Sequence, residues 1–173
     1  GDHRDLHVRS RRQRQMCIRD RHDGMSDELA FAIEDHYKPR FSGDDLPRNM
    51  VGICVALADK LETLVGMFGI GQAPSGDKDP FALRRHAFGI VRILVQKNLD
   101  INLYELIILT QEKMPEDIRH NIKNDPVIIN NFLLDRVRRY FSDQGNDYHA
   151  IESVVIPFGG TTPLGTLSDI VPM

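Results

Sequence analysis

The feature that most constrains the fold is a long run of apolar residues at helical spacing between residues 49 and 68. They recur three and four residues apart, at Val51, Cys54, Val55, Ala58, Leu61, Leu64, Val65 and Phe68. This spacing places them on one side of an α-helix, whereas a half-buried strand would alternate with a period of two. Because strand signals are weak along the whole chain, the sequence predicts an all-α fold that includes a well-buried helix over 49–68.

A first helix is expected over residues 27–38. Ser26 is a favoured N-cap residue. Pro39 disfavours helical backbone in the residue before it, so the helix is expected to end there. The next stretch, PRFSGDDLP at 39–47, is rich in turn formers and is expected to be a loop. The apolar residues of this first helix, at a spacing of four, are Leu29, Ile33 and Tyr37.

Residues 69–79, GIGQAPSGDKD, form the most distinctive loop. At its end, Asp79 followed by Pro80 is a typical helix start, with aspartate at the N-cap and proline at the first helical position. The sequence therefore predicts a helix over 80–97. Its apolar face is expected to consist of Phe81, Phe88, Val91 and Val95.

Capping residues mark three further helices. The first start resembles a capping box, because Glu105 stands three residues after the N-cap. The second repeats the aspartate–proline signal, and Gly145 beyond its end is a typical helix stop. The three helices are expected to begin after Asn102, Asp125 and Asp147 and to end near Lys113, Ser142 and Val155.

Residues 1–20 are expected to be foreign to the protein. The stretch RRQRQMCIRDR at 11–21 resembles one reading frame of the transposase adapter used to prepare sequencing libraries. Such scars have to be set aside before a fold is inferred. If the stretch were native, its arginines would make a basic arm able to neutralise nucleic-acid phosphates. We expect residues 1–20 to be disordered and the native sequence to begin near His22, within a longer gene.

The remaining chain is acidic. Residues 1–21 hold seven of the 22 Lys and Arg but three of the 25 Asp and Glu, which leaves a formal net charge of −7 for the rest. Binding to nucleic acid would then depend on a local basic patch. Cys54 is the only cysteine beyond residue 21, which excludes an internal disulfide and a cysteine metal cage and fits a reducing cytoplasm. No apolar run approaches the roughly 20 residues of a membrane-spanning helix.

The loop at 69–79 matches a phosphate-binding loop only in part. Gly71 and Gly76 have the required spacing, but Asp77 stands where such a loop needs its lysine, and no serine or threonine follows Lys78. A helix, not a strand, is expected before the loop, and a carboxylate inside it would repel a phosphate. The glycines are better explained as a helix stop and turns.

A second motif favours a relic of a metal-dependent phosphohydrolase site. His22-Asp23 resembles the His-Asp pair of such sites, and Asp59 stands mid-helix like their distant aspartate. His36 is a further candidate ligand, but the histidine-bearing helices that complete such sites are missing from the sequence. We therefore expect no bound metal and a vestigial Asp59, held in an ion pair or a cap.

Lys78, Arg84 and Arg85 are the candidate RNA- or partner-facing cations. They combine a glycine-containing loop with a helix N-terminus, which itself favours phosphate. Adjacent helical residues point about 100° apart, so one arginine is expected to face solvent or RNA while the other pairs with an acid. No nucleophile with a neighbouring base is evident, and no catalytic residue is assigned. A second basic cluster, expected to be a solvated face, consists of Arg136, Arg138 and Arg139.

Longer stretches of the sequence resemble a known family. RHDG at 21–24, HYKPRFSGDDLP at 36–47 and VALADKLETLVGMFGIGQAPSGDKDPFALRRHAFGIVRILVQKNLD at 55–100 are similar to the β subunits of the bacterial tetrameric glycyl-tRNA synthetase family. The resemblance covers most of residues 21–143. It weakens after Gly145, and residues 157–173 depart from the family's usual continuation.

The resemblance implies part of an enzyme that joins glycine to its tRNA at the expense of ATP, with magnesium, in an α2β2 tetramer. The family's glycine-activating core lies in the α subunit, while the β subunit contributes tRNA recognition. This chain would be a cytoplasmic fragment of the β subunit, inactive alone and without a cofactor of its own. Its partners would be the α subunit and tRNA(Gly), with Lys78, Arg84 and Arg85 as the candidate contacts.

The resemblance also implies a domain organisation. Residues 21–98 would be an HD-like helical region, and residues 99–156 a helical segment leading toward an anticodon-binding domain. Residues 157–173 would be an irregular, damaged end. Two alternatives stay open: an HD-type metal-dependent phosphohydrolase, which needs the missing upstream histidines, and a freestanding RNA-binding helical module, which needs residues 1–21 to be native.

Overall fold

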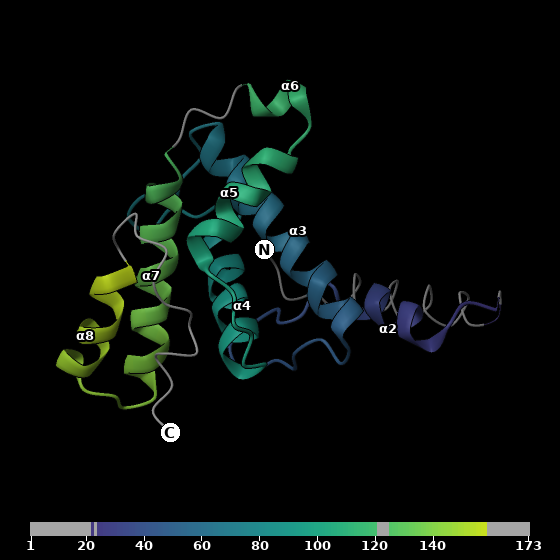
Figure 1. Ribbon diagram of the computed structural model, residues 1–173, viewed down its shortest axis with the longest axis horizontal. Coiled ribbons are helices and arrows are strands. Elements are labelled where there is room, and N and C mark those ends of the chain that lie inside the picture. The colour runs from purple at the N-terminus through teal and green to yellow at the C-terminus, as the bar shows by residue number, and fades with distance from the viewer. Residues whose placement is uncertain (1–21, 23, 121–124, 159–173) are drawn as a thin grey trace. The chain divides into compact units, whose positions relative to one another are not determined.

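The computed structural model describes residues 22, 24–120 and 125–158 of the 173-residue chain (Figure 1). The adapter-like stretch 1–20 therefore lies outside the described residues. Within them the chain is helical and contains no strand, apart from an isolated bridge between Ser75 and Lys78, which confirms the all-α fold. The helices are α2 (Asp27–Asp35), α3 (Met50–Gly69), α4 (Leu83–Gln96), α5 (Leu103–Lys113), α6 (Glu116–Arg119), α7 (Pro126–Asp143) and α8 (Tyr148–Phe158).

The chain divides into two compact units, residues 1–59 and 60–173. The described part of the first unit holds α2, the loop after it and the first half of α3. The second unit holds the rest of α3 and the helices from α4 to α8. The predicted regions 21–98 and 99–156 refer to the organisation of a longer protein and stay a prediction.

Helix α2 begins as predicted but ends early and buries a different face. The Ser26 hydroxyl accepts a hydrogen bond from the Leu29 N–H at 3.4 Å, and the helix ends at Asp35 instead of Lys38. Its buried residues are Ala30, Ala32 and Asp35, whereas Leu29 and Tyr37 are exposed. The alanine side of α2 is buried because the start of α3 packs close to it. A Cβ on Gly52 would lie 3.6 Å from the Ala32 Cα.

Helix α3 matches its predicted length within one residue at each end. In its second half Leu61, Leu64, Val65 and Phe68 are buried, as the spacing predicted. In its first half the buried side carries Ile53, Ala56 and Leu57, whereas the predicted positions Cys54, Val55 and Ala58 are exposed. This correction arises because the first half is apolar on every side, so that its period does not select a face.

Three helices end in the same hydrogen-bonded motif. After α3, the left-handed Gly71 (φ 77°) donates its N–H to the Phe68 carbonyl at 3.0 Å, and Gln72 donates to Met67 at 2.8 Å. This pattern is the Schellman motif. Asn98 after α4 and Gly145 after α7 have positive φ and the equivalent bonds. The prediction that Gly145 stands just beyond a helix end is confirmed.

Helix α4 begins at Leu83, three residues after the predicted Pro80. The Asp79 carboxylate does cap the helix, but through a turn: it accepts hydrogen bonds from the N–H groups of Leu83 (2.8 Å) and Arg84 (3.0 Å). Phe81, expected on the apolar face, lies before the helix and is exposed. The buried residues of α4 include Leu83, Ala87, Ile90, Val91, Ile93 and Leu94.

The core of the second unit surrounds α7. Helices α4, α5 and α8 all contact α7, and Leu133 and Val137 of α7 are fully buried. Phe68 of α3 packs against Phe132 with ring centroids 5.1 Å apart. The N-caps predicted from the sequence are confirmed, since Asn102, Asp125 and Asp147 each accept a hydrogen bond from the first turn of α5, α7 and α8. The four-residue α6 was not predicted, and α8 continues past Val155 into the stretch predicted to be irregular from 157.

Candidate functional site

The loop between α3 and α4 is closed by its own hydrogen bonds. Ser75 and Lys78 exchange two backbone hydrogen bonds of 3.1 and 2.9 Å around Gly76, whose φ is 51°. The Arg84 guanidinium donates to the Gly76 carbonyl. Together with the cap formed by Asp79, these contacts join the loop to the first turn of α4.

The three candidate cations have different environments. The side chains of Lys78 and Arg85 are exposed, and Arg84 is half-buried. Arg84 binds a backbone carbonyl, not the acid that was predicted for one of the two arginines. The structure therefore assigns Arg84 a contact within the fold and leaves Lys78 and Arg85 facing solvent. A role for any of the three in binding RNA or a partner stays a prediction.

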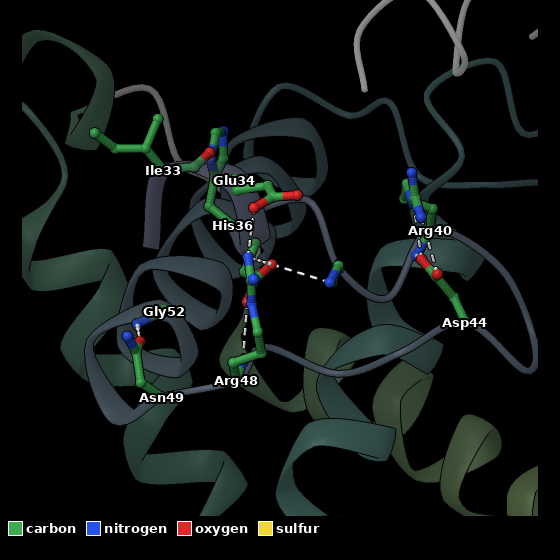
Figure 2. A network of polar contacts seen from close by, with 10 residues as sticks. Ile33, Glu34, His36, Arg40, Asp44, Arg48, Asn49 and Gly52 are labelled. Atoms are coloured by element: carbon green, nitrogen blue, oxygen red, sulfur yellow. Dashed lines mark hydrogen bonds and ion pairs between the residues drawn. The ribbon is translucent and has the colours of Figure 1, made fainter. Parts of the chain in front are cut away.

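A polar network orders the loop between α2 and α3 (Figure 2). Asp35, at the end of α2, is fully buried. Its carboxylate accepts hydrogen bonds from the Arg48 backbone N–H (3.0 Å) and from Arg48 Nε (2.8 Å) and Nη2 (3.0 Å). Lys38 Nζ lies 3.0 Å from Asp35 Oδ1. Arg48 also pairs with Glu34 at 2.6 Å and lies over the Phe31 ring at 3.9 Å.

These contacts shift the acidity of the groups involved. Burial raises the pKa of Asp35, but hydrogen bonds from the Arg48 side chain and backbone and from Lys38 together outweigh burial and hold that pKa below its ordinary value. Hydrogen bonding to Asp35 is the main cause that raises the pKa of Arg48. The charged forms are therefore the stable ones.

A second carboxylate closes the middle of the same loop. Asp44 accepts hydrogen bonds from the Arg40 backbone N–H (2.7 Å), Nε (2.8 Å) and Nη2 (3.0 Å) (Figure 2). Burial raises the pKa of Asp44, but the hydrogen bonds from Arg40 outweigh burial, and the net pKa lies below the ordinary value. The sequence predicts only a loop over 39–47. The four-residue spacing of Arg40 and Asp44 was the one signal of this pair.

The proposed vestigial metal residues do not form a cluster in the described chain. His36 bonds through Nδ1 to the Ile33 carbonyl at 2.8 Å, and its ring lies 4.1 Å from that of Tyr37. Asp59 is half-buried and His22 is exposed, while Asp23 lies outside the described residues. Among residues 22, 24–120 and 125–158, no group of three His, Cys, Asp or Glu side chains is placed to hold a metal ion.

The basic cluster on α7 is largely engaged in ion pairs. Arg138 Nε lies 2.7 Å from Glu152 of α8, and Arg138 Nη1 lies 2.9 Å from Asp135. The Glu152 hydrogen bond is the main cause that raises the pKa of Arg138. Arg139 pairs with Asp143 at 3.5 Å, and the third arginine, Arg136, lies over the Phe132 ring. An open pocket of about 400 Å³ lies here, lined by Asp135, Arg138, Arg139, Ser142, Asp143, Tyr148, Ile151 and Glu152.

None of the helices in the described ranges combines the length and the apolar character that crossing a membrane requires. The capped helices and the ion-paired loop form an all-α scaffold.

Comparison with known proteins identifies the family. The family model for the glycyl-tRNA synthetase beta subunit matches residues 20–156. The glycine–tRNA ligase beta subunit of Thiobacillus denitrificans is 52% identical over 134 residues, which are 78% of this chain and 19% of that protein. The beta subunit of Polaromonas naphthalenivorans is 54% identical over 134 residues, 78% of this chain and 18% of that protein.

The chain therefore belongs to the glycyl-tRNA synthetase beta-subunit family. It spans about a fifth of the length of the curated relatives it matches. The resemblance inferred from the sequence is confirmed.

Proposed function

We propose that this chain forms part of the β subunit of a glycine–tRNA ligase. In the assembled enzyme it supports the binding of tRNA(Gly) during the ATP-dependent attachment of glycine. The observation that carries the proposal is the family match over residues 20–156, with about half of the positions identical in the curated relatives. Identity of this extent across a whole helical segment preserves both the core and the surface.

The roles of the two subunits in the proposed enzyme are taken from the family. Its partners are an α subunit, in an α2β2 heterotetramer, and tRNA(Gly), and it works in the cytoplasm. ATP and magnesium are used at the glycine-activating core in the α subunit. We assign this segment no catalytic residue and no cofactor, and we expect it to be inactive alone. Its contribution is to position surfaces of the β subunit.

A segment exchange tests the function. In the Thiobacillus denitrificans β subunit, the matching segment is replaced by residues 22–156 of this chain and co-expressed with the α subunit of that organism. We expect the chimaera to assemble and to charge tRNA(Gly) with glycine at a rate within about tenfold of the parent, because roughly half of the exchanged positions are unchanged. A chimaera that assembles but forms no glycyl-tRNA would contradict the proposal.

Charge reversal tests the candidate cations. Lys78→Glu and Arg85→Glu in the chimaera are expected to weaken tRNA affinity, by about 1 kcal/mol or roughly fivefold for each lost phosphate contact. Both side chains are exposed, so the fold should persist. Arg84 is left unchanged because it bonds to Gly76. Lys113→Glu, at an exposed lysine on α5, is the matched control. Unchanged affinity in both variants would remove these residues from the interface.

A further inference from the structure

The first half of α3 is apolar on every side. From Met50 to Ala58 the sequence MVGICVALA contains no charged side chain and no polar group except the Cys54 thiol. A helix at a protein surface normally carries polar residues toward solvent, and a helix that is apolar all round is covered on both sides. In this structure one side of this half of α3 is buried, and it consists of Gly52, Ile53, Ala56 and Leu57.

The opposite side forms a continuous apolar surface. Met50 is 59% exposed and Val55 43% exposed, and Cys54 and Ala58 are also exposed. At 100° per residue, these four positions fall within about 140° of the helix circumference. We call them the exposed α3 face. It ends at Glu62, the next exposed charge on the same side.

The composition of the exposed α3 face resembles a protein core more than an interface between subunits. Cysteine, valine and alanine are among the residues that proteins most often bury completely. Interfaces between separate chains are instead enriched in tyrosine, tryptophan and arginine, together with methionine, and depleted in alanine. Of the four residues only Met50, at one end, belongs to the interface group.

We propose that the exposed α3 face is buried in the intact subunit against an apolar segment of the same polypeptide that lies outside this chain. The curated relatives are long enough to contain such a segment, because this chain covers only 18–20% of their length. Small side chains at Cys54 and Ala58 let the covering segment approach the helix closely. The inference rests on membership of the family. It depends on the proposed function only in that the intact β subunit is the protein used for the test.

The reactivity of Cys54 tests this burial directly. The chimaeric β subunit, purified as a monodisperse protein without the α subunit, is treated with iodoacetamide, and alkylation of the Cys54 peptide is followed by mass spectrometry. We expect alkylation more than about tenfold slower than in the denatured subunit, because reaction then requires local opening. In the isolated 173-residue chain, Cys54 should react at close to the denatured rate.

A second thiol on the same helix is the matched control. In the double variant Cys54→Ala, Glu62→Cys, the new thiol occupies the exposed, charged end of the face and should react rapidly in the intact subunit. Rapid reaction of Cys54 in the subunit alone would overturn the proposal. Protection that appears only with the α subunit, or only at high subunit concentration, would also overturn it, in favour of a different chain as the occupant. Aminoacylation is not the readout, so loss of activity and exposure of Cys54 are separate results.

Discussion

At the scale of single residues, Asp35 links the end of α2 to the loop that follows it in the first unit. It is fully buried, yet its charge is matched by three hydrogen bonds from Arg48 and by Lys38. A buried carboxylate is tolerated only when it is paired in this way. The network joins the end of α2 to Arg48, thirteen positions further along the chain and two residues before α3 begins.

Replacing Asp35 by alanine should destabilise the protein by about 2 kcal/mol. The value lies below that for a fully buried pair because the Arg48 side chain is 41% exposed and can be hydrated once Asp35 is gone. The measurement is equilibrium urea unfolding of the 173-residue chain. Asp45→Ala, at an exposed carboxylate in the same loop, is the control and should change the free energy of unfolding by less than about 0.5 kcal/mol. Equal effects would contradict the assigned role.

The two buried carboxylates also predict acid sensitivity. Asp35 and Asp44 have pKa values lowered in the folded state. Their contribution to stability is therefore fully present above the unfolded-state pKa of about 4 and is lost as the pH falls through the lower folded-state pKa. We expect the free energy of unfolding to fall steeply below about pH 4.

The variant Asp44→Asn isolates one of these groups. It should be less stable than the wild type at pH 7, and its free energy of unfolding should fall less between pH 5 and pH 2. Urea unfolding across this range gives both curves. Parallel curves would show that Asp44 does not have the lowered pKa.

At the scale of elements, the turn before α4 depends on Asp79. Its carboxylate bonds to two N–H groups of the first turn, across Ala82, whose φ of 55° is unfavourable for a residue other than glycine. Asp79→Ala should cost about 1 kcal/mol, and Asp79→Asn a smaller amount, because its single amide oxygen can accept only one of the two hydrogen bonds. Asp77→Ala, two residues earlier and exposed, is the control. If the two alanine variants lose equal stability in urea, then Asp79 does not act as the cap.

At the scale of the whole molecule, stability comes from the apolar cores of the two units. Leu133 of α7 is fully buried, and Ile128 on the same helix is 50% exposed. Leu133→Ala should lower the free energy of unfolding by about 3 kcal/mol, and Ile128→Ala by less than about 1 kcal/mol. Thermal or urea unfolding measures both variants. Similar losses would mean that α7 does not form the core of its unit.

The local signals in the sequence were sufficient for the helices and their caps. Ser26, Asn102, Asp125 and Asp147 cap the predicted helices, because an N-cap bond joins groups only a few residues apart. The class of the fold follows from the same short-range period. Long stretches such as residues 55–100 also allow the family to be recognised from the sequence, because homologous proteins keep the identities of many residues at once.

Only the tertiary structure decided which faces are buried and which charges pair. On α2 the alanines are buried in place of Leu29, since Gly52 lets α3 approach that side. On α3 the buried side includes Ile53, Ala56 and Leu57, and a helix that is apolar all round gives no local signal for that choice. The pairing of Asp35 with Arg48 depends on the path of the loop between them. Contacts between distant residues depend on the packing of all the elements together, whereas capping and periodicity depend only on neighbours along the chain.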